Sequence, residues 1–298
     1  MTQLTLFSPA GVLRNAAGVR RAAKRLTGLG FEVTIDAAAL KKFQRFGGND
    51  ATRLAAIHRI AQAAPGVALA TRGGYGLTRL LDRIDWKLLS RSIKHGTRWV
   101  GHSDVTALHL GLLAHANEHG TVGWAGPLAV DDFGRDVVDD VTVGCFVEAM
   151  TGVLDAIGYR TEGGFDGLGV TGTLWGGNLS VVCALLGTQH WPNIKGGVLF
   201  LEDVNEHPYR IERGLLQLHQ AGVLGAQKAV VLGAFNNYIT SPLDRGYTLK
   251  SAVQHMRSVC KVPILTGLPF GHVPTKVSLP VGARVKLLVN GRDALIAW

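Results

Sequence analysis

The sequence predicts an α/β protein whose N-terminal half is built on a mostly parallel sheet. Apolar strand patterns alternate with amphipathic helical patterns through that half. Such alternation implies right-handed crossover connections between parallel strands. A glycine-rich stretch without periodicity, residues 159–169, then separates this half from a second series of strands and helices. We therefore expect a domain at residues 1–158, a linker at 159–169 and a second domain at 170–298.

The first half supplies the alternation in order. Each strand pattern is short and apolar, and each helical pattern places its apolar residues on one face. Strands are predicted at 3–9, 31–36, 66–74 and 97–103, and helices at 15–30, 50–64, 77–84, 104–120 and 136–153. Because sites in parallel sheets form outside the carboxyl ends of the strands, the loops after residues 70 and 101 are expected to face one crevice.

The second half repeats the alternation with longer strand patterns. Strands are predicted at 170–178, 196–204, 228–235 and 262–267, and helices at 179–187 and 209–222. The final segment, 284–298, predicts a hairpin that turns on Asn290 and Gly291, because Asn-Gly suits a two-residue hairpin loop.

The composition is that of a globular protein. The 298 residues are 47% hydrophobic and 18% charged, and no segment predicts a transmembrane helix or a secretory signal. The net charge of +9 comes from scattered basic residues without interleaved aromatics, so we expect anionic small ligands rather than nucleic acid or a membrane as partners. Cys145, Cys183 and Cys260 are too few and too widely spaced for a disulfide framework, which favours a cytoplasmic protein.

Ser103 lies at the seam between a predicted strand and a predicted helix, in the stretch WVGHSDVTALHL. Serine is a common helix N-cap because its oxygen accepts hydrogen bonds from the first turn. A serine there is also placed for nucleophilic chemistry, because the N–H groups of a helix N-terminus can stabilise an oxyanion. The residues around Ser103 alone favour the N-cap over the nucleophile. Choosing between the two interpretations needs evidence from the rest of the chain.

Three further features could carry chemistry. Residues 72–76, RGGYG, follow a strand, and closely spaced glycines can form an anion-binding nest or a simple tight turn. Glu202 and Asp203 end an apolar strand, where they either reach water or line a cleft. His272 lies on a Gly/Pro-rich loop, where it is either a surface histidine or a general base.

One pattern suggests a metal site. His115, Glu118 and His119 match the His-x-x-Glu-His spacing of some zinc peptidases. They lie in the predicted last turn of a helix, where the helix dipole favours histidine, and no third ligand is marked. We therefore expect neither a metal nor another cofactor.

Five blocks, in this order, make the chain resemble the serine LD-carboxypeptidases, which include muramoyltetrapeptide carboxypeptidases and the related microcin-immunity peptidases. The blocks are RGGYGLTRLLDRIDW, GHSDVTALHL, WGGNLSVVCALLGT, LFLEDVNEHPYRIER and GLPFGHVPTKVSLPVG. The resemblance spans nearly the whole chain, and it reverses the interpretation of Ser103.

The resemblance implies a catalytic triad of Ser103 as nucleophile, Glu202 as acid and His272 as base. It also points to the N–H groups of Gly74 and Asp104 as the oxyanion hole, which would give RGGYG a role. The remaining expected site residues contact substrate: Arg72, Tyr75, Trp175 and Asn178, with Arg210 as a further candidate anion contact.

The resemblance implies a flavodoxin-like or amidotransferase-like N-terminal domain and a smaller C-terminal α/β domain with a β-rich sheet, with the site at the domain interface. It also implies a homodimer that releases terminal D-alanine from a cytoplasmic murein tetrapeptide. The alternatives are an immunity peptidase that cleaves a peptidyl-nucleotide and a non-catalytic murein-fragment binding protein. His102 stands where the family often has an aromatic residue, and FGGND replaces the family's usual Phe-Ala-Gly-Thr-Asp. Of these departures, His102 could alter the substrate pocket.

Overall fold

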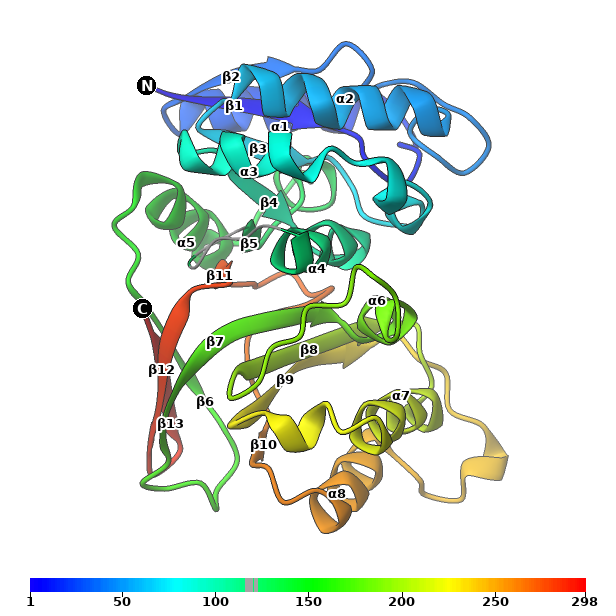
Figure 1. Ribbon diagram of the computed structural model, residues 1–298, viewed down its shortest axis with the longest axis vertical. Coiled ribbons are helices and arrows are strands. Elements are labelled where there is room, and N and C mark those ends of the chain that lie inside the picture. Colours follow the sequence, from blue (N-terminus) through cyan, green and yellow to red (C-terminus); the bar gives the residue numbers. More distant parts are fainter. Residues whose placement is uncertain (116–119, 121–122) are drawn as a thin grey trace. The chain divides into compact units, whose positions relative to one another are not determined.

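The computed structural model describes residues 1–115, 120 and 123–298 (Figure 1). Its chain divides into two compact units, each made of several stretches. The first unit comprises Met1–Leu154, Thr188–Pro192 and Pro274–Val281, and the second comprises Asp155–Gly187, Asn193–Val273 and Gly282–Trp298. Residues 161–168, inside the range expected to be a linker, belong to the second unit, where they connect two of its strands.

The first unit is built on a six-stranded sheet with the order β2-β1-β3-β4-β5-β11. The strands are β1 (Thr2–Phe7), β2 (Phe31–Ile35), β3 (Val67–Ala70), β4 (Arg98–Gly101), β5 (Gly123–Ala125) and β11 (Leu279–Val281). Strands β1 to β5 are parallel, and β11 runs antiparallel to β5. The order 2-1-3-4-5 is that of flavodoxin-like doubly wound sheets, which confirms the predicted architecture of the N-terminal domain.

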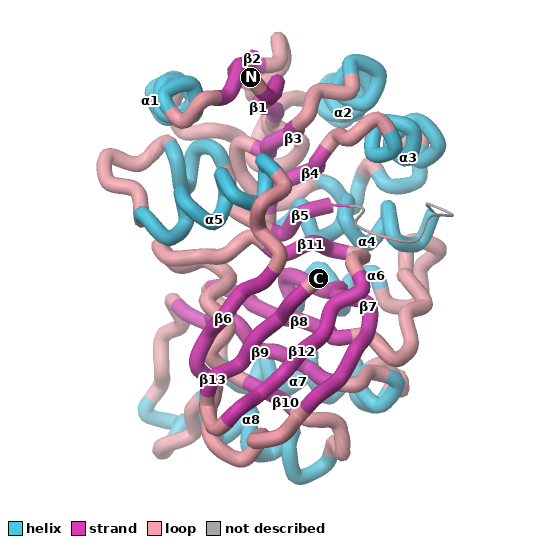
Figure 2. Tube along the Cα trace, turned by 90° about the vertical axis from the view of Figure 1, so that its left-hand side faces the viewer, coloured by secondary structure: helices cyan, strands magenta, loops and turns pink. Residues whose placement is uncertain are grey.

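Helices cover both faces of this sheet. They are α1 (Ala17–Gly28), α2 (Asp50–Ala63), α3 (Trp86–Lys94), α4 (Thr106–His115) and α5 (Asp140–Thr151). Figure 2 shows α1 and α5 on one side of the strands and α2, α3 and α4 on the other. The helix expected over 77–84 is instead two short 3₁₀ turns, Leu77–Arg79 and Leu81–Arg83, because its N–H groups bond to carbonyls three residues back.

The second unit holds a seven-stranded mixed sheet with the order β10-β9-β8-β7-β12-β13-β6. The strands are β6 (Ala156–Arg160), β7 (Gly169–Asn178), β8 (Val198–Val204), β9 (Ala229–Asn236), β10 (Ile264–Leu265), β12 (Arg284–Asn290) and β13 (Asp293–Ala297). The β7–β10 half is parallel and the β6, β12, β13 half is antiparallel. The predicted C-terminal hairpin is confirmed, with Gly291 at φ +60° in its turn.

Three helices accompany this sheet: α6 (Leu179–Leu185), α7 (Pro208–Gln220) and α8 (Leu249–Val259). Figure 2 looks onto strands β6, β13, β12 and β7, with α7 and α8 behind them. Asn178 ends β7 and caps α6, because its side-chain oxygen accepts a hydrogen bond from Val181 N. Cys145, Cys183 and Cys260 are unpaired. None of the helices in the described ranges is long and apolar enough to span a membrane.

Candidate active site

Ser103 occupies a strained turn directly after β4. Its backbone has φ +62°, in the left-handed region that costs a non-glycine residue about 1–3 kcal/mol. The described residues show no capping hydrogen bond at the start of this turn, whose N-cap position is held by His102. The capping interpretation of Ser103 therefore finds no support here, and the strain marks the residue as a candidate for chemistry.

The RGGYG loop packs directly against this serine. A Cβ added to Gly73 would lie 2.5 Å from Ser103 Cβ and 2.7 Å from Ser103 Oγ, closer than real Cβ contacts allow. Gly73 is held in place because its carbonyl oxygen accepts a hydrogen bond of 2.8 Å from Gly11 N. The loops after β3 and β4 therefore meet at Ser103, as the parallel sheet predicts.

Replacing Gly73 with alanine is expected to lower kcat about 100-fold, because the new methyl group displaces Ser103 Oγ and a misplacement of about 1 Å costs that much. Gly28→Ala is the matched control, since a Cβ there meets nothing within 4 Å. Steady-state kinetics on both variants, with thermal melts, measure the effect. A Gly73→Ala enzyme with wild-type kcat would show that this close approach does not position the serine.

Asp104 and Arg53 fix the far end of the RGGYG loop. Asp104 is buried, and its Oδ2 accepts a hydrogen bond of 2.8 Å from Leu77 N. Arg53, on α2, is fully buried and donates to Gly76 O at 2.9 Å and Pro9 O at 2.8 Å. Asp104 thus holds the loop that packs on Ser103, a role that the sequence did not reveal.

Burial raises the pKa of Asp104 to about 6, against the opposing hydrogen bond from Leu77 N–H. The folded protein therefore binds this proton more tightly than the unfolded chain does. The stability that this group contributes is fully present below the unfolded pKa of 3.8, and it is lost as the pH rises through about 6.

Asp104→Asn is expected to remove this pH dependence, because the amide stays neutral and its oxygen can still accept from Leu77 N–H. Between pH 4 and pH 7.5 the stability of the variant relative to wild type should rise by about 2 kcal/mol, because the unfolded chain has already lost part of this proton at pH 4. Chemical denaturation of both proteins at the two pH values measures the difference, and other titrating groups cancel in the comparison. A constant difference across this range would contradict the burial argument.

Glu202 and His272 form a hydrogen-bonded pair in the second unit. Glu202 is fully buried on β8, and its Oε2 lies 2.8 Å from His272 Nδ1. Asn236 Nδ2 fixes the loop by donating to His272 O at 2.8 Å. Gly271, at φ +128°, allows the loop that carries His272 to approach Glu202. A side chain at this position would be too close, because its Cβ would lie 3.0 Å from Glu202 Oε2. With Nδ1–H donated to the carboxylate, the basic nitrogen of His272 is Nε2.

Asp203, the next residue on β8, holds the start of α6. Its Oδ2 accepts from Ser180 N at 2.9 Å and Ser180 Oγ at 2.7 Å, at the first turn of α6. Asn178 Nδ2 joins the two acids by donating to Glu202 Oε1 at 3.2 Å and Asp203 Oδ1 at 2.8 Å. Asn178, expected to bind substrate, therefore orients the Glu202 carboxylate.

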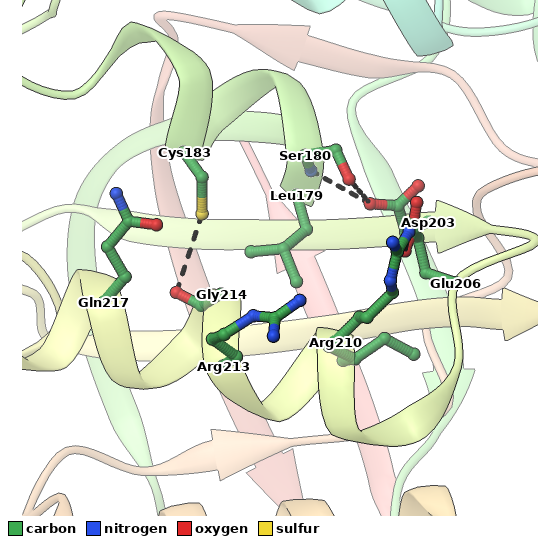
Figure 3. Close-up of a pocket in the computed structure, with 10 residues that line it drawn as sticks. Leu179, Ser180, Cys183, Asp203, Glu206, Arg210, Arg213, Gly214 and Gln217 are labelled. Atoms are coloured by element: carbon green, nitrogen blue, oxygen red, sulfur yellow. Dashed lines mark hydrogen bonds and ion pairs between the residues drawn. The ribbon is translucent and has the colours of Figure 1, made fainter.

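A cavity of about 380 Å³ lies on the Asp203 side, between α6 and α7. Figure 3 shows Asp203 turned toward Ser180, with Arg210 reaching toward Asp203 and Glu206, while Cys183 and Gln217 lie at the other end. Arg210, a candidate anion contact, pairs with Glu206 at 3.1 Å. Burial raises the pKa of Cys183 to about 11, so this thiol stays protonated.

The other expected contacts have different positions. Trp175 is fully buried and its Nε1 donates to Gln227 Oε1 at 3.0 Å, so in this structure it packs in the interior of the second unit. Tyr75 is 45% exposed and lies against Phe46. His102 is buried, with Nδ1 2.8 Å from Gly126 O.

Of the zinc-like pattern, only His115 lies within the described residues; Glu118 and His119 lie outside them. His115 Nε2 is 2.8 Å from His190 Nδ1, and its ring stacks on Trp86 at a centroid distance of 4.9 Å. His190 Nε2 is in turn 2.8 Å from Asp82 Oδ1. The Nε2 atom of His115 is therefore engaged in a chain of hydrogen bonds.

Activity is expected to survive exhaustive chelation, because the residues proposed below for catalysis are a serine, a histidine and a glutamate. The measurement is turnover after dialysis against EDTA, with a parallel sample to which zinc is restored. Reversible loss of activity, recovered with zinc, would show that His115 and its neighbours in sequence hold a catalytic metal.

The first unit holds a strained serine at the carboxyl edge of a doubly wound sheet, and the second holds a buried carboxylate paired with a histidine. These are residue types that serine hydrolases use. Comparisons with known proteins give the family. Residues 4–123 match the LD-carboxypeptidase N-terminal domain, and residues 171–287 match the LD-carboxypeptidase C-terminal domain.

Individual proteins similar to this chain agree with the family match. The crystal structure of muramoyltetrapeptide carboxypeptidase from Oxalobacter formigenes is 37% identical, with a TM-score of 0.90 over 99% of this chain and 98% of that one. A protein named "Probable murein peptide carboxypeptidase" from Bacillus subtilis is 28% identical over 90% of this chain and 83% of its own. Microcin C7 self immunity protein MccF, in complex with aspartyl sulfamoyl adenosine, shares the fold at 19% identity, with a TM-score of 0.86 over 100% of this chain and 96% of that one.

The chain belongs to the LD-carboxypeptidase family and is an enzyme of that class. This confirms the resemblance found in the five sequence blocks.

Proposed function

We propose that this enzyme is a serine peptidase that hydrolyses the L,D amide bond of a cytoplasmic murein tetrapeptide and releases terminal D-alanine. The observation that carries the proposal is the hydrogen bond between the buried Glu202 carboxylate and His272 Nδ1. This arrangement is what a serine needs from its partners, namely a base of fixed tautomer and a negative charge that stabilises the imidazolium. The names of the relatives support the murein peptide as substrate.

In the proposed reaction His272 Nε2 takes the proton from Ser103 Oγ as the oxygen attacks the scissile carbonyl carbon. The N–H groups of Gly74 and Asp104 stabilise the oxyanion, and the described residues provide no protein acceptor for either group. The proton on His272 then passes to the departing amine of D-alanine. Water, deprotonated by the same histidine, cleaves the acyl-enzyme and regenerates Ser103.

The roles of the remaining proposed residues follow from their positions. Glu202 holds and stabilises the histidine, and Asn178 holds Glu202. Tyr75 and Arg72 remain proposed substrate contacts: both belong to the loop that packs on Ser103, and Tyr75 is exposed. The unpaired cysteines support a reducing compartment, and the family resemblance supports a homodimer, which sedimentation of the purified protein would test.

A peptidyl-nucleotide is the second candidate substrate, because the fold is shared with MccF in complex with aspartyl sulfamoyl adenosine. The test is to incubate the purified enzyme with a murein tetrapeptide and, separately, with a peptidyl-nucleotide, and to follow both by mass spectrometry. Loss of one alanine from the tetrapeptide alone supports the proposal. Cleavage of the peptidyl-nucleotide alone favours the immunity peptidase, and tight binding without cleavage of either favours a binding protein.

A further inference from the structure

A second cavity, in the first unit, is surrounded by arginines. It has a volume of about 500 Å³ and lies between the start of α1 and the residues 130–136. We call it the arginine pocket, and its charged lining residues are Arg14, Arg21, Arg72, Arg135, Asp131 and Asp136. Four guanidinium groups face two carboxylates, so the lining carries a net charge of about +2 at neutral pH.

The backbone that forms the arginine pocket is held by hydrogen bonds and close packing. Arg25 of α1 donates to Phe133 O, to Arg135 O at 2.9 Å and to Asp136 O at 3.2 Å, which ties this loop to the helix. Glycines allow the close packing: a Cβ on Gly18 would lie 2.9 Å from Val130 Cγ1, and one on Gly134 would lie 2.7 Å from Gly18 O. A preformed site loses less entropy on binding than one that must be ordered.

Only some of the guanidinium groups in the arginine pocket make hydrogen bonds or ion pairs with other residues. Arg21 donates to Gly134 O at 2.8 Å and pairs with Asp136 at 3.3 Å, and Arg72 donates to Val12 O at 2.8 Å. Across the described residues, the side chains of Arg14 and Arg135 make no hydrogen bond or ion pair. Arg72 also pairs with Asp131 at 4.0 Å, and burial raises the pKa of Asp131 against the nearby Arg72 and Arg135.

The chemistry of the lining favours one class of ligand. A guanidinium offers a planar fork of donors that matches the oxygens of phosphate and carboxylate. A single carboxylate would bind one guanidinium group. Several guanidinium groups around one cavity instead suit an anion with several oxygens and at least two negative charges. We propose that the arginine pocket binds a phosphoryl group, such as a diphosphate.

Two kinds of molecule carry this chemistry. Arg72 directly precedes Gly73, which packs on Ser103, so the pocket and the nucleophile share one loop. The phosphoryl group could therefore belong to a nucleotide-linked peptide substrate, a source that rests on the proposed function. It could equally belong to a free phosphoryl compound that binds independently of catalysis.

The test uses inorganic pyrophosphate and isothermal titration calorimetry. Wild-type protein is expected to bind it, with an affinity that falls as salt is added. The double variant Arg14→Ala/Arg135→Ala should bind at least about 10-fold more weakly, because each charge-assisted hydrogen bond is worth about that much. Arg20→Ala/Lys24→Ala is the matched control: it removes two exposed charges of α1 that do not line the pocket, and it should bind as wild type does.

A competition measurement identifies the source. Catalytically inactive Ser103→Ala protein is loaded with a nucleotide-linked tetrapeptide and titrated with pyrophosphate. Displacement of the loaded peptide supports the pocket as the phosphoryl site of a substrate, and binding without displacement supports it as a site for a free phosphoryl compound. Failure of wild type to bind pyrophosphate, or equal binding by the double variant, overturns the proposal whether or not the enzyme cleaves tetrapeptide.

Discussion

Ser103→Ala enzyme is expected to lose about 10⁴-fold or more in kcat while it stays folded. The alanine removes only one oxygen, from a side chain that is 9% exposed, and it leaves the packing on Gly73 intact. What remains is binding and oxyanion stabilisation, which support a small residual rate after a triad member is removed. Release of D-alanine from tetrapeptide by wild type and variant, with melting curves for both, measures the loss.

The control for this prediction is a serine that lies elsewhere in the same unit. Ser92 is buried on α3, donates to Leu89 O at 2.7 Å and accepts from Trp99 Nε1 at 3.0 Å, so Ser92→Ala removes the same atom type from a serine that is not part of the proposed site. It should lower stability modestly and leave kcat near that of wild type. If Ser103→Ala protein that has been purified from contaminating peptidases turns over tetrapeptide at a near-normal rate, the serine mechanism is wrong.

The architecture of the first unit could be predicted because its signals are local. Short apolar strands alternating with helices require parallel pairing, and parallel pairing places the loops after β3 and β4 at one edge of the sheet. Gly73 and Ser103 therefore meet although 30 residues separate them.

Other parts of the site depend on contacts that no local pattern shows. Arg53 lies among the polar positions of an amphipathic helix and would be expected in water, yet it is fully buried because Pro9 O and Gly76 O accept from it. Trp175 was expected to contact substrate, but it is fully buried and its N–H donates to Gln227 Oε1. Burial set by distant segments explains both differences.

Glu202→Gln is expected to lower kcat by about 10²–10⁴. The amide keeps the size of the side chain, but it removes the charge that stabilises the His272 imidazolium. It also places an amide next to His272 Nδ1, which favours the wrong tautomer when its N–H faces the ring. Because Glu202 is buried and its Oε2 lies 2.8 Å from Nδ1, no solvent can take over this role.

Asp203→Asn is the matched control, because it makes the same carboxylate-to-amide change one residue along the same strand. Asp203 Oδ2 accepts from Ser180 N and Oγ at the start of α6, so its loss should cost about 1 kcal/mol of stability, as for a helix cap. Its effect on kcat should be smaller than that of Glu202→Gln, since it reaches the acid only through Asn178. Comparing kcat/KM and melting temperature for both variants separates the two roles. If Asp203→Asn is inactive and Glu202→Gln works normally, the acid of the proposed triad is Asp203 and its hydrogen bonds to Ser180 are secondary.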